Sequence, residues 1–230
     1  MDWSFLFFLT SVLFGLGLSG AVFYGAVSAV RGEKNFGGWK LWVSALMFSA
    51  LQFGFALAGY GISKSLADHS GMKDSLLWAS LFLCLYFGGK MILEGLRTLR
   101  RGEISLEKQL RASEKPLEAK PRMTAEEAVP GRTVTRTRVS DKIPVLWKVF
   151  LKAFSASGGA FAAGFSIPKL PFIGALTEGG IIFLLTFIFA LFGLLRSQDK
   201  DVKIPCYLEI LGGVLLIAAM VLSMVRHFTA

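Results

Sequence analysis

The chain has 230 residues, of which 53% are hydrophobic and 18% are charged, and its mean hydropathy is +0.57. This composition excludes an ordinary soluble domain and indicates an integral membrane protein. The formal net charge of +9 does not indicate nucleic-acid binding, because the basic residues lie between the hydrophobic runs and no recognition motif accompanies them.

The hydrophobic runs predict the fold class. A helix needs about 20 apolar residues to cross a hydrocarbon core about 30 Å thick. We predict an all-α membrane protein with six transmembrane helices, over residues 5–30, 41–62, 76–96, 146–167, 172–195 and 207–225. The first run could instead be a secretory signal, since Val27-Ser28-Ala29 resembles a cleavage site. The length of the run and the absence of Lys or Arg before it favour a retained helix.

Between the third and fourth runs lies a charged segment without apolar periodicity, residues 98–143. It contains three prolines, Pro116, Pro121 and Pro130. We predict a disordered linker here. The alternative is a short surface helix over residues 103–117, where leucines recur near helical spacing. The linker separates an N-terminal three-helix unit, residues 1–97, from a C-terminal one, residues 144–230.

Basic residues predict the orientation of the spans. The side of the membrane that holds the linker carries twenty Lys and Arg residues, whereas the other side carries four. Lys and Arg concentrate on the cytoplasmic side of membrane proteins. We therefore predict a multi-pass protein of the plasma (inner) membrane, with a cytoplasmic linker and both termini external.

The two three-helix units share short motifs in the same order. A GAxxxG pattern occurs in the first and fourth spans, an FALxG-like pattern in the second and fifth, and a glycine doublet in the third and sixth. The matched segments are 20–25 with 159–164, 55–59 with 189–193, and 88–89 with 212–213. Because each unit has an odd number of spans, the second enters the membrane from the opposite side. The predicted fold is thus two inverted repeats, an architecture of transporters, whose sites lie between the repeats.

Polar residues and repeat glycines near the middle of the spans are the candidates for a transport cavity. These candidates are Ser19, Gly20, Gln52, Ser157, Gly159 and Thr186. Small residues four apart in the same motifs also indicate close helix packing, which alone explains the glycines.

Lys90 and Glu94 lie one helical turn apart in the third span and form either a structural ion pair or a gate. Glu178 and Glu209 lie near span ends and can face the interface. We find no spacing typical of a metal site, no cofactor motif and no catalytic constellation, so the sequence gives no support to an enzyme.

Three segments resemble a known family. The run 87–95 (FGGKMILEG) resembles the end of the third helix of the manganese efflux pump (MntP-like) family, within the LysE transporter superfamily. Residues 209–213 resemble the start of its sixth helix and Gly59-Tyr60-Gly61 the end of its second. The resemblance covers the six spans but not the linker. It implies a six-helix exporter with two inverted repeats and external termini.

One departure from the family concerns its metal ligands. The resemblance places acidic residues where this chain has Gly20, Gln52 and Gly159. A dehydrated divalent cation needs such hard, charged oxygen ligands. This chain has no acidic residues at these three positions, so the resemblance does not identify the substrate. From the resemblance we expect a secondary transporter whose substrate is a divalent cation or a small solute.

Two alternatives remain open. The first is a diverged membrane scaffold or subunit that holds a partner or a second copy of the chain through its apolar faces and basic linker. The second is a divalent-metal exporter that uses Glu94, Glu178 or Glu209 in place of the missing acids.

Overall fold

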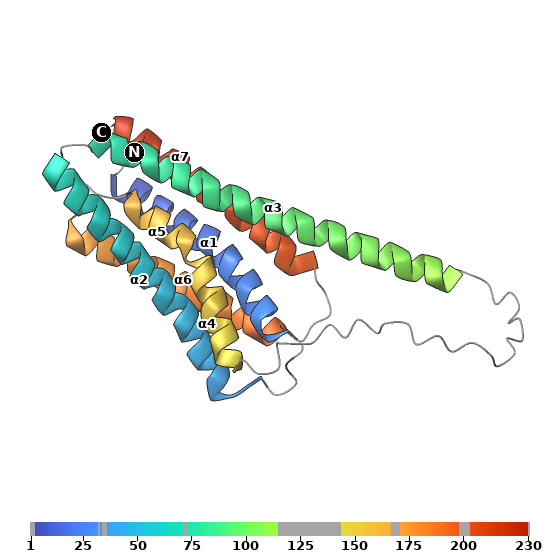
Figure 1. Ribbon diagram of the computed structural model, residues 1–230. Helices are drawn as coiled ribbons and strands as arrows, with labels where there is room; N and C mark the ends of the chain where they lie inside the picture. The colour runs from blue at the N-terminus through green and yellow to red at the C-terminus, as the bar shows by residue number, and fades with distance from the viewer. Residues whose placement is uncertain are drawn as a thin grey trace, which may run out of the picture.

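The computed structural model describes residues 3–31, 33, 36–70, 73–114, 144–166, 171–197 and 203–229, and every regular element in them is a helix (Figure 1). The helices are α1 (Trp3–Val30), α2 (Trp39–Ser70), α3 (Lys73–Glu114), α4 (Val145–Ala156), α5 (Gly158–Phe165), α6 (Phe172–Arg196) and α7 (Lys203–Thr229). The predicted all-α class is confirmed for the described part of the chain.

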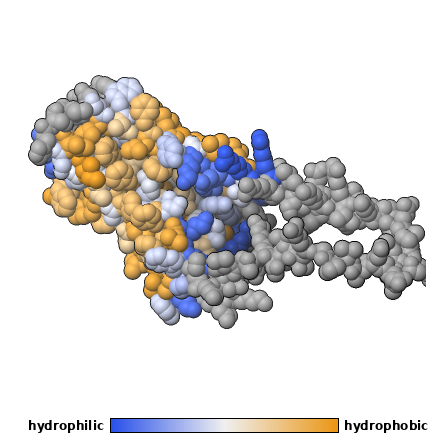
Figure 2. All heavy atoms as spheres, in the orientation of Figure 1, coloured by the Kyte–Doolittle hydropathy of each residue, from blue (hydrophilic) through white to orange (hydrophobic). Residues whose placement is uncertain are grey.

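Five of these helices are long and apolar enough to cross a membrane. They cover Phe7–Val30, Trp39–Asp68, Ser75–Arg100, Phe172–Arg196 and Lys203–Val225. Large apolar side chains such as Phe82, Ile173 and Phe192 lie on the outside of the bundle, and Figure 2 shows apolar residues over most of the visible bundle surface. Such an outer surface suits lipid, so the protein is a multi-pass membrane protein in contact with the bilayer.

The fourth predicted span is not one continuous helix. It consists of α4 and α5, which meet at Ser157, and neither alone is long enough to cross a membrane. The Ser157 amide donates to the Phe154 carbonyl three residues back, and the Ala160 amide then starts a new helix from the Ser157 carbonyl. Two glycines follow Ser157, and serine and glycine both favour helix interruption over a helix interior.

The linker prediction also needs a correction at its start. Helix α3 does not end with its apolar part but continues to Glu114, so it protrudes from the bundle (Figure 1). The alternative of a helix near residues 103–117 is therefore correct as far as Glu114, although the helix is an extension of α3. The rest of the predicted disordered segment, residues 115–143, lies outside the described residues.

The bundle has two ends. Both chain termini lie at one end, here called the terminal end (Figure 1). At the other, here called the linker end, α1 and α6 finish and α4 and α7 begin. Helix α1 packs against α6 and α7, α2 packs against α6 and against α4 and α5, and α3 packs against α7 and α5.

Glycines allow the helices to approach closely. A Cβ atom on Gly17 would lie 2.8 Å from the backbone nitrogen of Leu216, and one on Gly164 would collide with the Ala56 carbonyl. Such contacts leave no room for a side chain, so packing accounts for these two members of the small-residue motifs.

Candidate functional site

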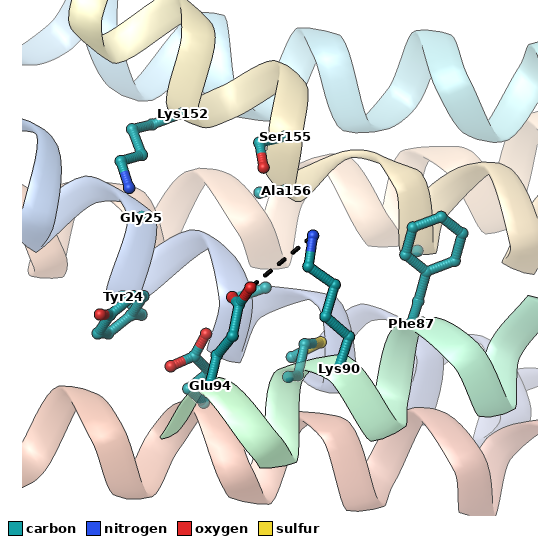
Figure 3. A pocket seen from close by; sticks show the side chains of 12 residues that line it. Tyr24, Gly25, Phe87, Lys90, Glu94, Lys152, Ser155 and Ala156 are labelled. Atoms are coloured by element: carbon teal, nitrogen blue, oxygen red, sulfur yellow. Dashed lines mark ion pairs between the residues drawn. The ribbon is translucent and has the colours of Figure 1, made fainter. Parts of the chain in front are cut away.

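A partly open pocket of about 80 Å³ lies between α1, α3, α7 and the junction of α4 with α5 (Figure 3). Its lining residues are Ala21, Tyr24, Gly25, Phe87, Lys90, Met91, Glu94, Lys152, Ser155, Ala156, Gly159 and Glu209. Four of these carry charged side chains, which come from three different helices. Intramembrane charge is costly and usually functional, so we take this pocket, called the charged pocket below, as the candidate site.

The charged pocket lies in the half of the bundle nearer the linker end. Glu94 is six residues from Arg100, where the apolar part of α3 ends, and Glu209 is six residues from Lys203, where α7 begins. At 1.5 Å per residue both carboxylates lie about 9 Å into their spans. They therefore lie between the linker end and the middle of the bundle.

Lys90 and Glu94 form the predicted ion pair. The Lys90 Nζ lies 3.8 Å from Glu94 Oε1, one helical turn along α3. Both side chains extend from α3 toward α4 and line the charged pocket (Figure 3). Their side chains are 44% and 48% exposed. An ion pair that is this exposed to solvent contributes little to stability.

Glu209 differs from this pair because it is buried. The residue is 3% exposed, and its Oε2 has no hydrogen-bond partner in the part of the chain that the structure describes. Glu94, Lys152 and Lys90 all lie close enough to act on it electrostatically. An uncompensated carboxylate oxygen in an apolar bundle costs several kcal/mol on the order-of-magnitude scale for buried polar groups.

The junction of α4 and α5 borders the charged pocket and is held by Gln52 of α2. Gln52 is completely buried, and its Nε2 donates to the Ala156 carbonyl over 3.2 Å. The helix break deprives that carbonyl of its regular helical position, and the Gln52 amide satisfies it. The Ser157 hydroxyl donates to the Ala153 carbonyl over 2.7 Å. Gln52 of α2 therefore stabilises the break between α4 and α5 through this hydrogen bond.

The six cavity candidates do not form one cavity among the described residues. Gly159 is the member that lines the charged pocket. Ser19 and Thr186 donate hydrogen bonds to carbonyls of their own helices. Gly20 lies against α7, where a Cβ atom would collide with the Leu208 carbonyl and come within 2.9 Å of the Gly212 Cα. It is a packing contact rather than open space.

Sequence reasoning missed Lys152 and placed Glu209 at the interface. Both lie near the starts of apolar segments, where basic and acidic residues are common in any membrane protein. The available signal was the position of Glu209 six residues into α7. Its orientation toward α3 and α4 depends on packing between helices that are far apart in the chain.

Within the described residues, no three His, Cys, Asp or Glu side chains come together. Glu178, in α6, is buried but does not line the charged pocket. The two carboxylates that do line it share it with two lysines. This mixed set of charges does not resemble the all-oxygen, anionic ligand set that a hard divalent cation prefers.

Comparison with known proteins adds no relative: no protein-family model, no curated protein and no solved structure matches this chain.

Proposed function

We propose that the protein is a secondary transporter of the manganese-efflux-like LysE superfamily type, which exports a small solute or cation through the charged pocket. The single observation that carries the proposal is this pocket, which brings the exposed residues Lys90, Glu94 and Lys152 together with the buried Glu209 within the span length of a largely apolar bundle. Ionisable groups at membrane depth are rare and by default indicate a functional site, which supports transport through this pocket.

The arrangement of the helices supports a transporter. The proposed repeats pair α1 with the interrupted span α4–α5, α2 with α6, and α3 with α7. Under this pairing, the contact between α1 and α6 corresponds to the contact between α4–α5 and α2. The contact of α1 with α7 corresponds to that of α5 with α3. This exchange of contacts is what two inverted repeats produce. With α4 and α5 counted as one interrupted span, the proposed topology crosses the membrane six times, with both termini external and the linker end cytoplasmic.

The broken helix supports the same function. Discontinuous helices at binding sites are a recurrent feature of secondary transporters, because the break exposes backbone groups within the membrane. Here the break at Ser157 lies beside the charged pocket and is stabilised by Gln52. A local rearrangement of α4 against α5 would change access to the pocket without unfolding either helix.

The experiment is a flux measurement in proteoliposomes with a panel of labelled substrates that includes Mn²⁺, monovalent cations, and small acidic, basic and neutral solutes. We expect uptake of at least one above that of empty liposomes, and loss of this uptake in Lys152→Met. The matched control is Lys64→Met, because Lys64 lies over the Tyr60 ring outside the charged pocket.

Two results would refute the proposal. One is uptake of no panel member by the native protein. The other is equal loss of uptake in the Lys152 and Lys64 variants, since Lys152 lines the pocket and Lys64 does not.

A scaffold function is the second candidate, and the protruding part of α3 favours it. This helix continues to Glu114, well beyond the end of its apolar part at Arg100. Removal of residues 101–143 with a short replacement linker would abolish a scaffold function. It should leave flux through the charged pocket intact, because every lining residue that the structure describes lies outside that segment.

A further inference from the structure

The buried carboxylate of Glu209 has one oxygen atom without a hydrogen-bond partner among the described residues. Its Oε2 is enclosed and accepts no hydrogen bond from the described residues, and none of the ion pairs among them includes it. A proton or a cation that binds this oxygen removes the free-energy cost of burying it without a partner. Glu209 lines the charged pocket, so a proton or a cation can reach its carboxylate from the pocket.

The groups that face Glu209 come from every helix around it. They are Tyr24 on α1, Lys90 and Glu94 on α3, Lys152 on α4 and Cys206 one turn away on α7 itself. Lys90 is already paired with Glu94 at 3.8 Å. Glu209 is thus surrounded by charges of both signs, and their balance depends on what occupies the pocket.

The two lysines decide between a proton and a metal cation. A dehydrated metal ion needs several oxygen ligands around it and is repelled by ammonium groups. The charged pocket has Lys90 and Lys152 in its lining. A proton needs only one oxygen atom, and its addition to a carboxylate removes a charge from the apolar bundle.

We propose that Glu209 is the proton-binding site of this protein and that H⁺ is its coupling ion. Oε2 takes a proton from water at the linker end and becomes a neutral carboxyl group. The proton later returns to water, and the carboxylate forms again. Loss of one negative charge leaves Lys152 and Lys90 with only Glu94 as counter-charge, so the pocket would hold a negatively charged group more strongly when Glu209 is protonated. The coupling to transport rests on the proposed function, whereas the proton binding does not.

Proton binding can be measured without a known substrate, as the charge displaced when proteoliposomes on a solid-supported membrane receive a pH step. A proton that reaches Glu209 travels about 9 Å of a core about 30 Å thick, so at most about a third of an elementary charge moves per molecule. We expect a transient current in the native protein and its loss in Glu209→Gln, which keeps the shape of the side chain. Glu178→Gln, at a buried carboxylate outside the pocket, should keep the current.

A second readout guards against a variant that fails to fold. Infrared difference spectra between acid and alkaline buffer should contain a protonated-carboxyl band that Glu209→Gln removes while the amide bands of the helices stay unchanged. An unchanged current or band in Glu209→Gln would overturn the inference. So would a current that follows a Na⁺ step at constant pH. Flux without a pH-step current would overturn proton binding at Glu209 but leave the proposed transport function standing. A pH-step current without any flux would support proton binding but overturn the transport function.

Discussion

The two ends of the bundle have different chemistry. At the linker end, α3 directs Lys90 and Glu94 into the charged pocket. When the glycine doublets 88–89 and 212–213 are aligned, the positions on α7 that correspond to these residues are Val214 and Ala218. Lys90 and Glu94 therefore have no charged counterparts at the aligned positions of α7.

The terminal half is closed by backbone contacts. Gly59 on α2 meets the Phe161 carbonyl, and Gly164 on α5 meets the Ala56 carbonyl, so these two helices touch without intervening side chains. The Ser63 hydroxyl adds a hydrogen bond of 2.9 Å to the Phe165 carbonyl. The two halves therefore differ: α2 and α5 are sealed against each other in the terminal half, whereas the linker half holds the charged pocket, in which the Lys90 and Glu94 side chains are 44% and 48% exposed.

The largest expected effect comes from a substitution in the sealed half. Gly164→Leu would drive a side chain into the Ala56 backbone and separate α2 from α5. Forced overpacking of this kind costs about 3 kcal/mol. We expect a marked loss of monodisperse protein in size-exclusion chromatography and a lower midpoint in denaturant titration. Gly54→Leu is the matched control, because a Cβ atom at Gly54 has no neighbour within 4 Å. Equal stability of both variants would show that the seal is not formed by this contact.

The second effect concerns Gln52, at the boundary between the two halves. Gln52→Leu removes the donor to the Ala156 carbonyl at the helix break. We expect a loss of about 1–2 kcal/mol in the free energy of unfolding, because a buried carbonyl then lacks its partner. Ser49→Ala is the control, since the Ser49 hydroxyl donates to carbonyls of its own helix and should change stability by less than about 0.5 kcal/mol. Unchanged stability in Gln52→Leu would mean that the sequence at residues 157–159 alone sustains the break.

Much of the fold could be predicted from hydropathy. Five apolar runs became long helices, because about 20 consecutive apolar residues can be satisfied in lipid only as a helix. The interruption at Ser157 was not predicted, because the run 146–167 is mostly apolar beyond Lys148 and Lys152 and hydropathy does not register a break in backbone hydrogen bonding. The extension of α3 was predicted only as an alternative, because its apolar periodicity is weak.

The candidate site was harder to predict than the spans. The pairing of Lys90 with Glu94 follows from their spacing on one helix and is confirmed. The approach of Glu209 to them depends on the packing of α7 against α3, which no local pattern records. Gln52 was singled out as an intramembrane polar residue, but its contact with Ala156 joins residues 104 positions apart. The family resemblance and the substrate stay predictions.

The smallest expected effect lies at the mouth of the open half. Lys148 in the first turns of α4 and Glu33 after α1 form an ion pair of 3.3 Å, with side chains 27% and 37% exposed. A double-mutant cycle with Lys148→Met and Glu33→Gln should give a coupling energy of about 0.2–1 kcal/mol, because such pairs are partly screened by solvent. The coupling should shrink further when the unfolding titrations are repeated at about 1 M salt, where the Debye length falls to about 3 Å. The Gly164→Leu effect should not respond to salt, because it arises from steric overlap. A coupling energy of zero would mean that this ion pair does not stabilise the linker end, and the contrast between the two halves would then reduce to the charged pocket alone.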